Sequence, residues 1–218
     1  MDYKIVEVKE DILVENNQKA NQLRKTLKEE GIFMINVMAS PGSGKTTLLT
    51  NLINRLKSKY QIGVMEADID GDVDALRISQ NTGVRSIQIH TSGACHLTAQ
   101  MVEDAINEFD VKGLNLLFIE NVGNLVCPAE FDTGANFNMM LLSVPEGDDK
   151  PLKYPLMFEV SKIAVITKID TVDIFDFDFK RCEDNIHKRN KEAKIFKVSA
   201  LNDEGVDILA EYIDSLIK

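Results

Sequence analysis

IFMINVMASPGSGKTTLLTNLINRL, residues 32–56, decides the fold of this 218-residue chain. Its first part, residues 32–38, is a short apolar run bounded by a glycine and by a Gly/Pro cluster, which is typical of a strand buried on both faces of a parallel sheet. Its last part repeats leucine and isoleucine at helical spacing, so one face of a helix would pack on that sheet. The segment therefore predicts a strand, a loop and a helix in direct succession.

The loop between them, residues 40–46, fits a phosphate-binding loop, except that Ala39 stands where the first glycine usually lies. Its two glycines let consecutive backbone N–H groups turn toward one anion, Lys45 would reach the outer phosphates, and Thr46 offers a hydroxyl to Mg²⁺. A glycine-rich turn without a ligand is the alternative, and the flanking strand and helix disfavour it. The predicted nucleotide contacts here are Gly42, Ser43, Gly44, Lys45, Thr46 and Thr47.

Alternating strand and helix signals along the rest of the chain predict an α/β P-loop NTPase, whose mainly parallel β-sheet is flanked by helices on both faces. We expect residues 31–218 to form the nucleotide-binding domain with its metal site. Residues 1–30 would be an N-terminal extension, whose amphipathic helix Asp11–Glu30 packs on this core. The net charge of −10 disfavours nucleic acid and anionic membranes as partners. With neither a transmembrane run nor a signal peptide visible, we predict a cytoplasmic protein.

An acidic stretch follows the predicted second strand, residues 62–66. It places four aspartates within residues 67–74, at the carboxyl end of a strand, where ligands bind in open α/β sheets. One of them would touch Mg²⁺ directly or through water, with Asp68 favoured and Asp72 and Asp74 behind it. The alternative is a solvated surface loop.

A second carboxylate, Glu120, ends the apolar strand predicted at residues 114–119. We interpret Glu120 as a further Mg²⁺ ligand. Gly123 follows it closely and can donate its N–H to a terminal phosphate, so these two residues would sense the γ-phosphate. The residues predicted to act in catalysis are Lys45, Asp68, Glu120 and Gly123.

Three residues form a candidate soft-metal site, namely Cys95, His96 and Cys127. A nitrogen and sulfur ligand set suits zinc, nickel or copper better than magnesium. The first two would open a helix running to about Phe109, whose N-terminus lowers the thiol pKa. Three ligands leave a fourth position open, which suggests exchange with a partner or completion by a second subunit. Free cysteines acting as small buried hydrophobes are the alternative. Cys182 and His187 have poor spacing for ligands and are interpreted as structural.

The base of the nucleotide is predicted from residues 167–170, TKID, after a strand at residues 163–166. The Asp170 carboxylate can accept both the ring N–H and the exocyclic amine of guanine, which adenine cannot supply, while the Lys168 stem covers the base. A further strand, residues 195–198, leads into Ser199, Ala200 and Leu201, a loop of the type that contacts guanine O6. GTP is therefore favoured over ATP.

Two surface segments have less specific patterns. The proline-bracketed stretch 145–155 predicts a mobile surface connection, from which Lys150 and Lys153 would reach a nucleotide or a partner subunit. The apolar segment 174–179 is either core or a subunit contact.

GACHLTAQM, ENVGNLVCP and KPLKYP, together with SPGSGKTT, resemble the HypB family, the nickel-inserting GTPases of [NiFe]-hydrogenase maturation. This family lies in the dimeric P-loop GTPase group that includes UreG. The resemblance implies GTP/GDP and Mg²⁺ as cofactors, Ni²⁺ or Zn²⁺ at Cys95, His96 and Cys127, and a GTP-dependent homodimer. It also implies a hydrogenase large-subunit precursor and an accessory maturation protein as partners. Asp68 and Asp74 match acidic positions of the first switch region.

The chain departs from the family in two places. Thr167 replaces the usual Asn of the base-recognition motif, and the N-terminus carries neither a CCxxC-like motif nor a histidine-rich stretch. Tight N-terminal nickel binding is therefore not implied, and the site around Cys95 must carry the metal function.

Our hypothesis is a nucleotide-gated metal handover, in which GTP orders the turn 120–123 and so shifts Cys127. Asn124 occupies the position of the water-orienting glutamine of Ras-like GTPases, so hydrolysis should be slow, on the order of 10⁻⁴ to 10⁻² s⁻¹. Two alternatives stay open. One is a small-molecule kinase with structural cysteines, and the other is a metal-binding scaffold whose nucleotide never turns over.

Overall fold

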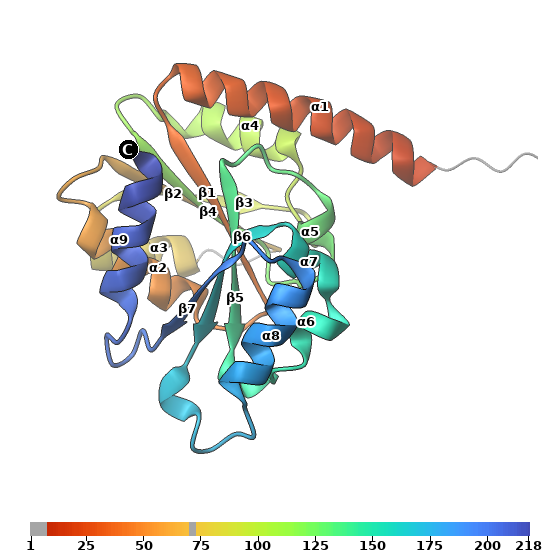
Figure 1. The fold of residues 1–218 in the computed structure, drawn as a ribbon. Helices are drawn as coiled ribbons and strands as arrows, with labels where there is room; N and C mark the ends of the chain where they lie inside the picture. Colours follow the sequence, from red (N-terminus) through yellow and green to blue (C-terminus); the bar gives the residue numbers. More distant parts are fainter. Residues whose placement is uncertain (1–7, 70–72) are drawn as a thin grey trace, which may run out of the picture.

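A sheet of seven parallel strands forms the centre of the computed structural model, which describes residues 8–69 and 73–218 (Figure 1). The strands lie in the order β3-β2-β4-β1-β5-β6-β7. Their bounds are β1 Phe33–Ala39, β2 Ile62–Asp68, β3 Arg85–His90, β4 Leu116–Glu120, β5 Phe137–Ser143, β6 Ser161–Thr167 and β7 Lys194–Val198. The strand that precedes the phosphate loop, β1, lies in the middle of this sheet between β4 and β5.

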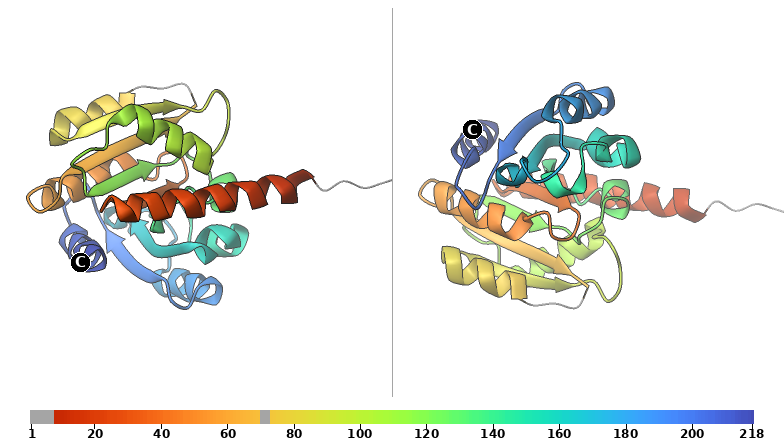
Figure 2. Two further views of the ribbon diagram at one scale, coloured as in Figure 1. Left: turned by 90° about the horizontal axis from the view of Figure 1, so that it is seen from above. Right: turned by 90° about the horizontal axis from the view of Figure 1, so that it is seen from below.

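Helices cover both faces of the sheet, as Figure 2 shows from two sides. They are α1 Val8–Glu29, α2 Lys45–Leu56, α3 Val73–Thr82, α4 Ala99–Phe109, α5 Cys127–Glu130, α6 Lys150–Lys153, α7 Pro155–Glu159, α8 Phe179–Arg189 and α9 Val206–Ile217, with 3₁₀ turns η1 Val144–Glu146 and η2 Ile169–Thr171. One face packs against α2, α3 and α9, and the other against α1, α4 and the helices α5, α7 and α8. The predicted fold class is therefore confirmed. No helix in the described part of the chain is long and apolar enough to cross a membrane.

The segment around the phosphate loop folds as its pattern predicts. Six of the seven β1 residues are buried, because a central parallel strand is covered on both faces. Ile35 and Val37 pack toward α2, while Met34 and Met38 pack toward the opposite helices. In α2 the buried positions are Lys45, Leu48, Leu49, Leu52, Ile53 and Leu56.

Helix α1 lies beside α4 on the sheet (Figure 1). It begins at Val8, slightly earlier than predicted, and buries Ala20, Leu23 and Leu27. Gly31, with φ +73°, follows the helix end in the left-handed conformation that glycine adopts readily. The amphipathic helix is thus confirmed, whereas the domain boundary at residue 30 stays a prediction.

The stretch 145–155 is not the open loop that the sequence predicted. It forms α6 and the start of α7, and Pro151 is buried. The prolines occupy the first turns of short helices, where a missing N–H group costs nothing. Lys153 pairs with Asp149 at 2.6 Å, and Lys150 lies over the Tyr154 ring, so both lysines have neighbours within this same segment.

The apolar segment 174–179 divides between core and surface. Phe177 is buried and packs edge-on against Phe179, with ring centroids 5.3 Å apart. Ile174 is 78% exposed, so for this residue the core alternative is excluded and the subunit contact stays a prediction.

Candidate nucleotide and metal sites

The phosphate loop lies at the carboxyl edge of the sheet, where β1 meets α2. Gly42 and Gly44 have φ values of +75° and +94°, which explains why the sequence has glycine at both positions. Lys45 is buried, and its Nζ lies 3.4 Å from the Ser40 carbonyl oxygen and 3.9 Å from Glu120 Oε1. Thr46 Oγ1 donates to the same Glu120 oxygen at 3.3 Å. The tertiary structure therefore brings Glu120 to the phosphate loop.

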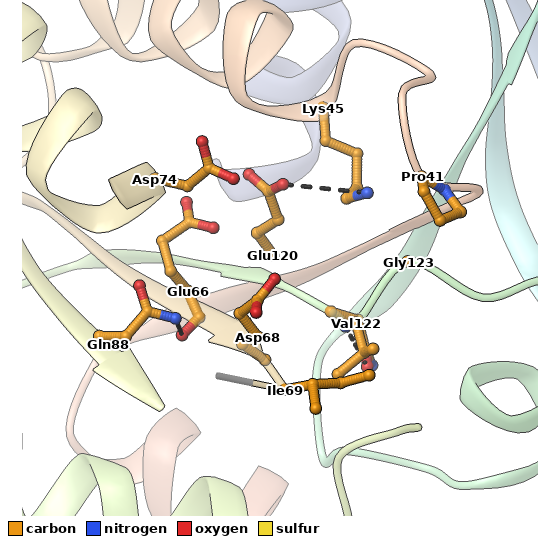
Figure 3. Close-up of a pocket in the computed structure, with 12 residues that line it drawn as sticks. Pro41, Lys45, Glu66, Asp68, Ile69, Asp74, Gln88, Glu120, Val122 and Gly123 are labelled. Carbon is orange, nitrogen blue, oxygen red and sulfur yellow. Dashed lines mark hydrogen bonds and ion pairs between the residues drawn. The ribbon is translucent and has the colours of Figure 1, made fainter. Parts of the chain in front are cut away.

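An acidic cavity of about 390 Å³ opens beside this loop (Figure 3). Its lining includes Lys45, Glu66, Asp68, Asp74 and Glu120. Glu66 and Glu120 are paired in the register of β2 and β4, so their carboxyl groups leave the sheet as neighbours. Asp68 is exposed at the end of β2, and Asp74 lies in the first turn of α3. The predicted Mg²⁺ ligand Asp72 lies outside the described residues.

The two glutamates are held in an electrostatically costly arrangement. Burial, followed by the charge of Glu120, raises the pKa of Glu66 to about 10. Burial also raises the pKa of Glu120, although Lys45 acts in the opposite direction. Glu66 Oε1 and Glu120 Oε2 are buried without a hydrogen-bond partner among the described residues. Buried, unpaired carboxyl oxygens next to a threonine hydroxyl are a donor set that fits Mg²⁺.

A second cleft, of about 380 Å³, continues along the loop on the side of α3. Its lining includes Gly44, Thr47, Asp74, Arg77 and Lys168. The Arg77 Nη1 atom lies 3.7 Å from Asp74 Oδ1. The cleft thus combines the backbone of the phosphate loop with three cationic side chains, because Lys45 lines it as well, and this suits a polyphosphate.

Sequence reasoning gave no role to Glu66 or Arg77. The available signal for Glu66 was a glutamate inside an otherwise apolar strand, two residues before Asp68. No local signal pointed to Arg77, since its position in the cleft depends on how α3 packs beside the loop.

The elements predicted to recognise the base also meet at this edge. Asp170 Oδ1 accepts a hydrogen bond of 2.5 Å from the buried Ser199 hydroxyl, which joins the ends of β6 and β7. The Ala200 carbonyl oxygen accepts from Asn51 Nδ2 of α2 at 2.7 Å, while Leu201 is 81% exposed. Lys168 Nζ donates to the Gly42 carbonyl oxygen at 2.6 Å.

Thr167, the departure from the family motif, has a structural role. Its hydroxyl donates to the Ser43 carbonyl oxygen at 2.8 Å, and both residues are buried. The end of β6 is thereby attached directly to the phosphate loop. A threonine is long enough for this contact.

The three candidate soft-metal ligands lie together. One ligand atom each from Cys95, His96 and Cys127 lies within 4.8 Å of the other two, and all three residues are half-buried. Cys95 Sγ is 3.8 Å from His96 Nδ1. Burial lowers the pKa of His96, which favours the neutral imidazole that binds metals. The donor set and spacing fit a nickel or zinc ion.

The prediction that Cys95 and His96 open a helix is wrong. Helix α4 begins only at Ala99, because Thr98 is its N-cap and accepts a hydrogen bond from the Met101 N–H at 3.2 Å. Cys95 and His96 therefore lie in the preceding loop. The pKa of Cys127 is raised, first by its hydrogen bond with Cys95 and then by burial.

Neighbouring residues hold these ligands. The His96 ring stacks on Phe131, with centroids 3.9 Å apart. Asn124 Nδ2 donates to the Cys95 carbonyl oxygen at 3.4 Å, and its Oδ1 accepts from the Val126 N–H at 2.8 Å. Asn124 thus joins the segment that carries Cys95 to the segment that leads into Cys127.

Cys182 and His187, interpreted as structural, lie apart from this site on α8. Cys182 is fully buried, and burial raises its pKa to about 12. His187 is exposed.

Comparison with known proteins relates this geometry to a family. Residues 33–197 match the model of the CobW/HypB/UreG nucleotide-binding domain. The chain is 41% identical to the hydrogenase maturation factor HypB of Escherichia coli K12 over 212 residues, 97% of this chain and 73% of that protein. It is 40% identical to the hydrogenase/urease maturation factor HypB of Helicobacter pylori 26695, covering 96% of this chain and 87% of that one.

Solved structures agree with these sequence matches. The crystal structure of H. pylori HypB in complex with nickel superposes with a TM-score of 0.86 at 39% identity, covering 93% of this chain and 95% of that one. The crystal structure of HypB from Archaeoglobus fulgidus also superposes with a TM-score of 0.86, at 32% identity, covering 94% of this chain and 100% of that one. An LAO/AO transport system kinase, at 16% identity and a TM-score of 0.56, shares the fold alone, with 98% and 76% coverage. The chain therefore belongs to the CobW/HypB/UreG family of P-loop nucleotide-binding proteins, and within it to the HypB group.

Proposed function

We propose that this protein is a slow GTPase that holds a nickel or zinc ion at Cys95, His96 and Cys127 and delivers nickel for [NiFe]-hydrogenase maturation. The observation that carries the proposal is the continuity between the two sites. Gly123 packs against Pro41 of the phosphate loop, and Asn124, the next residue, donates to the Cys95 carbonyl oxygen. A movement of this turn on nucleotide exchange would therefore act on the metal ligands directly.

The chemistry of the nucleotide site supports binding and slow turnover. Mg²⁺, held by Thr46, Asp68, Glu120 and Asp72, would neutralise phosphate charge when bound. Lys45 would hold the outer phosphates, and the Gly123 N–H would donate to the terminal one. Asp170 and Lys168 would hold the guanine base, with Ser199, Ala200 and Leu201 around it.

The position of Asn124 supports the proposal of slow turnover. Both polar atoms of its side chain are engaged, with the Cys95 carbonyl oxygen and with the Val126 N–H. An amide held in this way is not available to orient an attacking water. We expect isolated protein to hydrolyse GTP on the order of 10⁻⁴ to 10⁻² s⁻¹.

The incomplete ligand set supports the proposed partners. Three half-buried ligands leave room for a fourth from a second copy of the chain or from a receiving protein. We therefore propose a GTP-dependent homodimer that transfers nickel to a hydrogenase large-subunit precursor, with help from an accessory maturation protein. Free thiols and GTP suit the cytoplasm.

Titration of the chain with Ni²⁺ in the presence of GDP, and then of a non-hydrolysable GTP analogue, tests the proposal. We expect nickel affinity to differ between the two nucleotides, because only differential binding can couple two sites. Cys95→Ala should abolish the binding, while Asn124→Ala should keep the binding but reduce the difference.

Equal nickel affinity in both nucleotide states would leave a metal-binding scaffold whose nucleotide does not gate the ion. Sedimentation recorded in the same samples tests the dimer separately, since a monomer with GTP would contradict only that part.

A further inference from the structure

Asn16 is a buried polar residue on α1, far in sequence from both sites. Its side chain is 8% exposed, whereas its neighbour Asn17 is exposed. Its Nδ2 donates to the Asp132 carbonyl oxygen at 2.9 Å, and its Oδ1 accepts from the Ala99 N–H at 2.9 Å. Both the donor and the acceptor of this amide are thus used in the interior, which requires a specific placement of both partners.

The two partners of Asn16 belong to the two segments that carry the metal ligands. Ala99 begins α4, directly after the loop with Cys95 and His96. Asp132 follows α5, the short helix that begins at Cys127. A single side chain on α1 therefore connects both sides of the metal site.

Further contacts hold the second segment on α1. Arg24 Nη2 lies 2.7 Å from both carboxylate oxygens of Asp132, and Arg24 Nε donates to the Ala135 carbonyl oxygen at 2.9 Å. The residue before Asp132 is Phe131, on which the His96 ring stacks. The position of α1 therefore affects Phe131, whose ring is in direct contact with the candidate metal ligand His96.

We infer that Asn16 is a positioning residue for the metal site: its amide sets the separation between the loop that carries Cys95 and His96 and the helix that begins at Cys127. Helix α1 then holds the two segments that carry the metal ligands, in addition to packing on the sheet. This inference rests on the proposed metal function.

The decisive comparison is Asn16→Ala against Asn17→Ala, which make the same change at adjacent positions of one helix. Each full-length variant is titrated with Ni²⁺ against a chromophoric chelator, and the thiolate-to-nickel charge-transfer absorption is recorded. Residues that orient metal ligands typically change affinity by about tenfold to a hundredfold. We expect such a loss, with an altered charge-transfer band, in Asn16→Ala and wild-type behaviour in Asn17→Ala. GDP affinity should be unchanged in both variants.

Asn16→Asp removes the donor alone, because its carboxylate keeps the acceptor for the Ala99 N–H but places an oxygen against the Asp132 carbonyl oxygen. We expect a loss of nickel affinity here as well, because two acceptors repel each other at this distance, and this variant decides the matter if Asn16→Ala does not fold. Wild-type affinity and spectrum in a folded Asn16 variant would overturn the inference alone. Failure of the wild-type protein to bind nickel would instead remove the proposed metal function.

Discussion

Pro41 and Gly123 are in such close contact that no side chain fits between them. A Cβ atom on Gly123 would lie 2.9 Å from Pro41 Cγ and 3.0 Å from the Pro41 backbone nitrogen. The phosphate loop and the turn after β4 therefore form one packed unit. This unit connects the nucleotide cleft to the segment that leads into Cys127.

We expect Gly123→Ala to disturb both sites, because the new methyl group must push the turn away from the phosphate loop. Overpacking of this kind costs roughly 1–3 kcal/mol of unfolding free energy. GTP affinity should fall, and nickel affinity should change with it, as calorimetry of each ligand can measure. Pro41→Ala in the same chain should restore part of the loss, since it removes the nearest atom. If Pro41→Ala restores neither the GTP affinity nor the nickel affinity of Gly123→Ala, the proposed coupling between the two sites is contradicted.

Asp170→Asn tests the base assignment. The change removes the acceptor for the guanine ring N–H, so GTP affinity should fall by about tenfold to a hundredfold, while xanthosine triphosphate binding should improve. The fold should persist, because an asparagine can keep the hydrogen bond to Ser199. Equal GTP affinity in the variant and the wild type would remove the guanine assignment.

Glu66→Gln tests the residue that sequence reasoning missed. Glu66 lies directly opposite Glu120 in the sheet and lines the same cavity. If it helps Glu120 to hold Mg²⁺, the variant should bind Mg²⁺–nucleotide about tenfold more weakly, whereas nucleotide binding in a metal chelator should not change. Titrations with and without Mg²⁺ separate these outcomes. An equal loss under both conditions would assign Glu66 to packing alone.

Thiol accessibility distinguishes the three cysteines. Cys182 is fully buried with a raised pKa, so it should react with a thiol reagent only after unfolding. Cys95 and Cys127 are half-buried and should both react in the native protein. Excess Ni²⁺ should protect these two, and a Cys182→Ala variant should give the same native count. Reaction of all three thiols without unfolding would contradict the described burial.

The stability of the contact between α9 and the turn after α2 should depend on pH. Asp214 accepts hydrogen bonds from Lys218 at 2.8 Å, from Tyr60 at 2.7 Å and from Lys59 at 3.0 Å, and these partners lower its pKa. A folded-state pKa below the unfolded value of about 3.9 means that the stabilisation is present above about pH 4 and is lost as the pH falls. Asp214→Asn should therefore destabilise the protein at pH 7 and have less effect at pH 3. Urea unfolding of the wild type and of Asp214→Asn at pH 7 and pH 3 measures the free energy of unfolding of each. The same difference in this free energy at both pH values would refute the prediction.

Several features were predictable because they depend on neighbours in the sequence. The phosphate loop needs an apolar strand before it and an amphipathic helix after it, and residues 32–56 contain all three parts. The position of Glu120 at a strand end, and the pairing of residues 167–170 with residues 199–201, follow from the regular alternation of strands and helices. The chemical types of Cys95, His96 and Cys127 likewise indicated a soft metal before their geometry was known.

By itself, the sequence determined the α/β class, the phosphate loop and the identity of the candidate ligands, because short-range periodicity and motif spacing encode these. Only the tertiary structure decided that Cys95 lies outside α4, that residues 150–153 and 155–159 form helices, and that Glu66 and Arg77 line the nucleotide site. The same holds for the link that Asn16 makes between Ala99 and Asp132. The physical reason is that such roles depend on which strands and helices become neighbours. Those contacts join residues that are distant along the chain, as Asn16 is from Asp132.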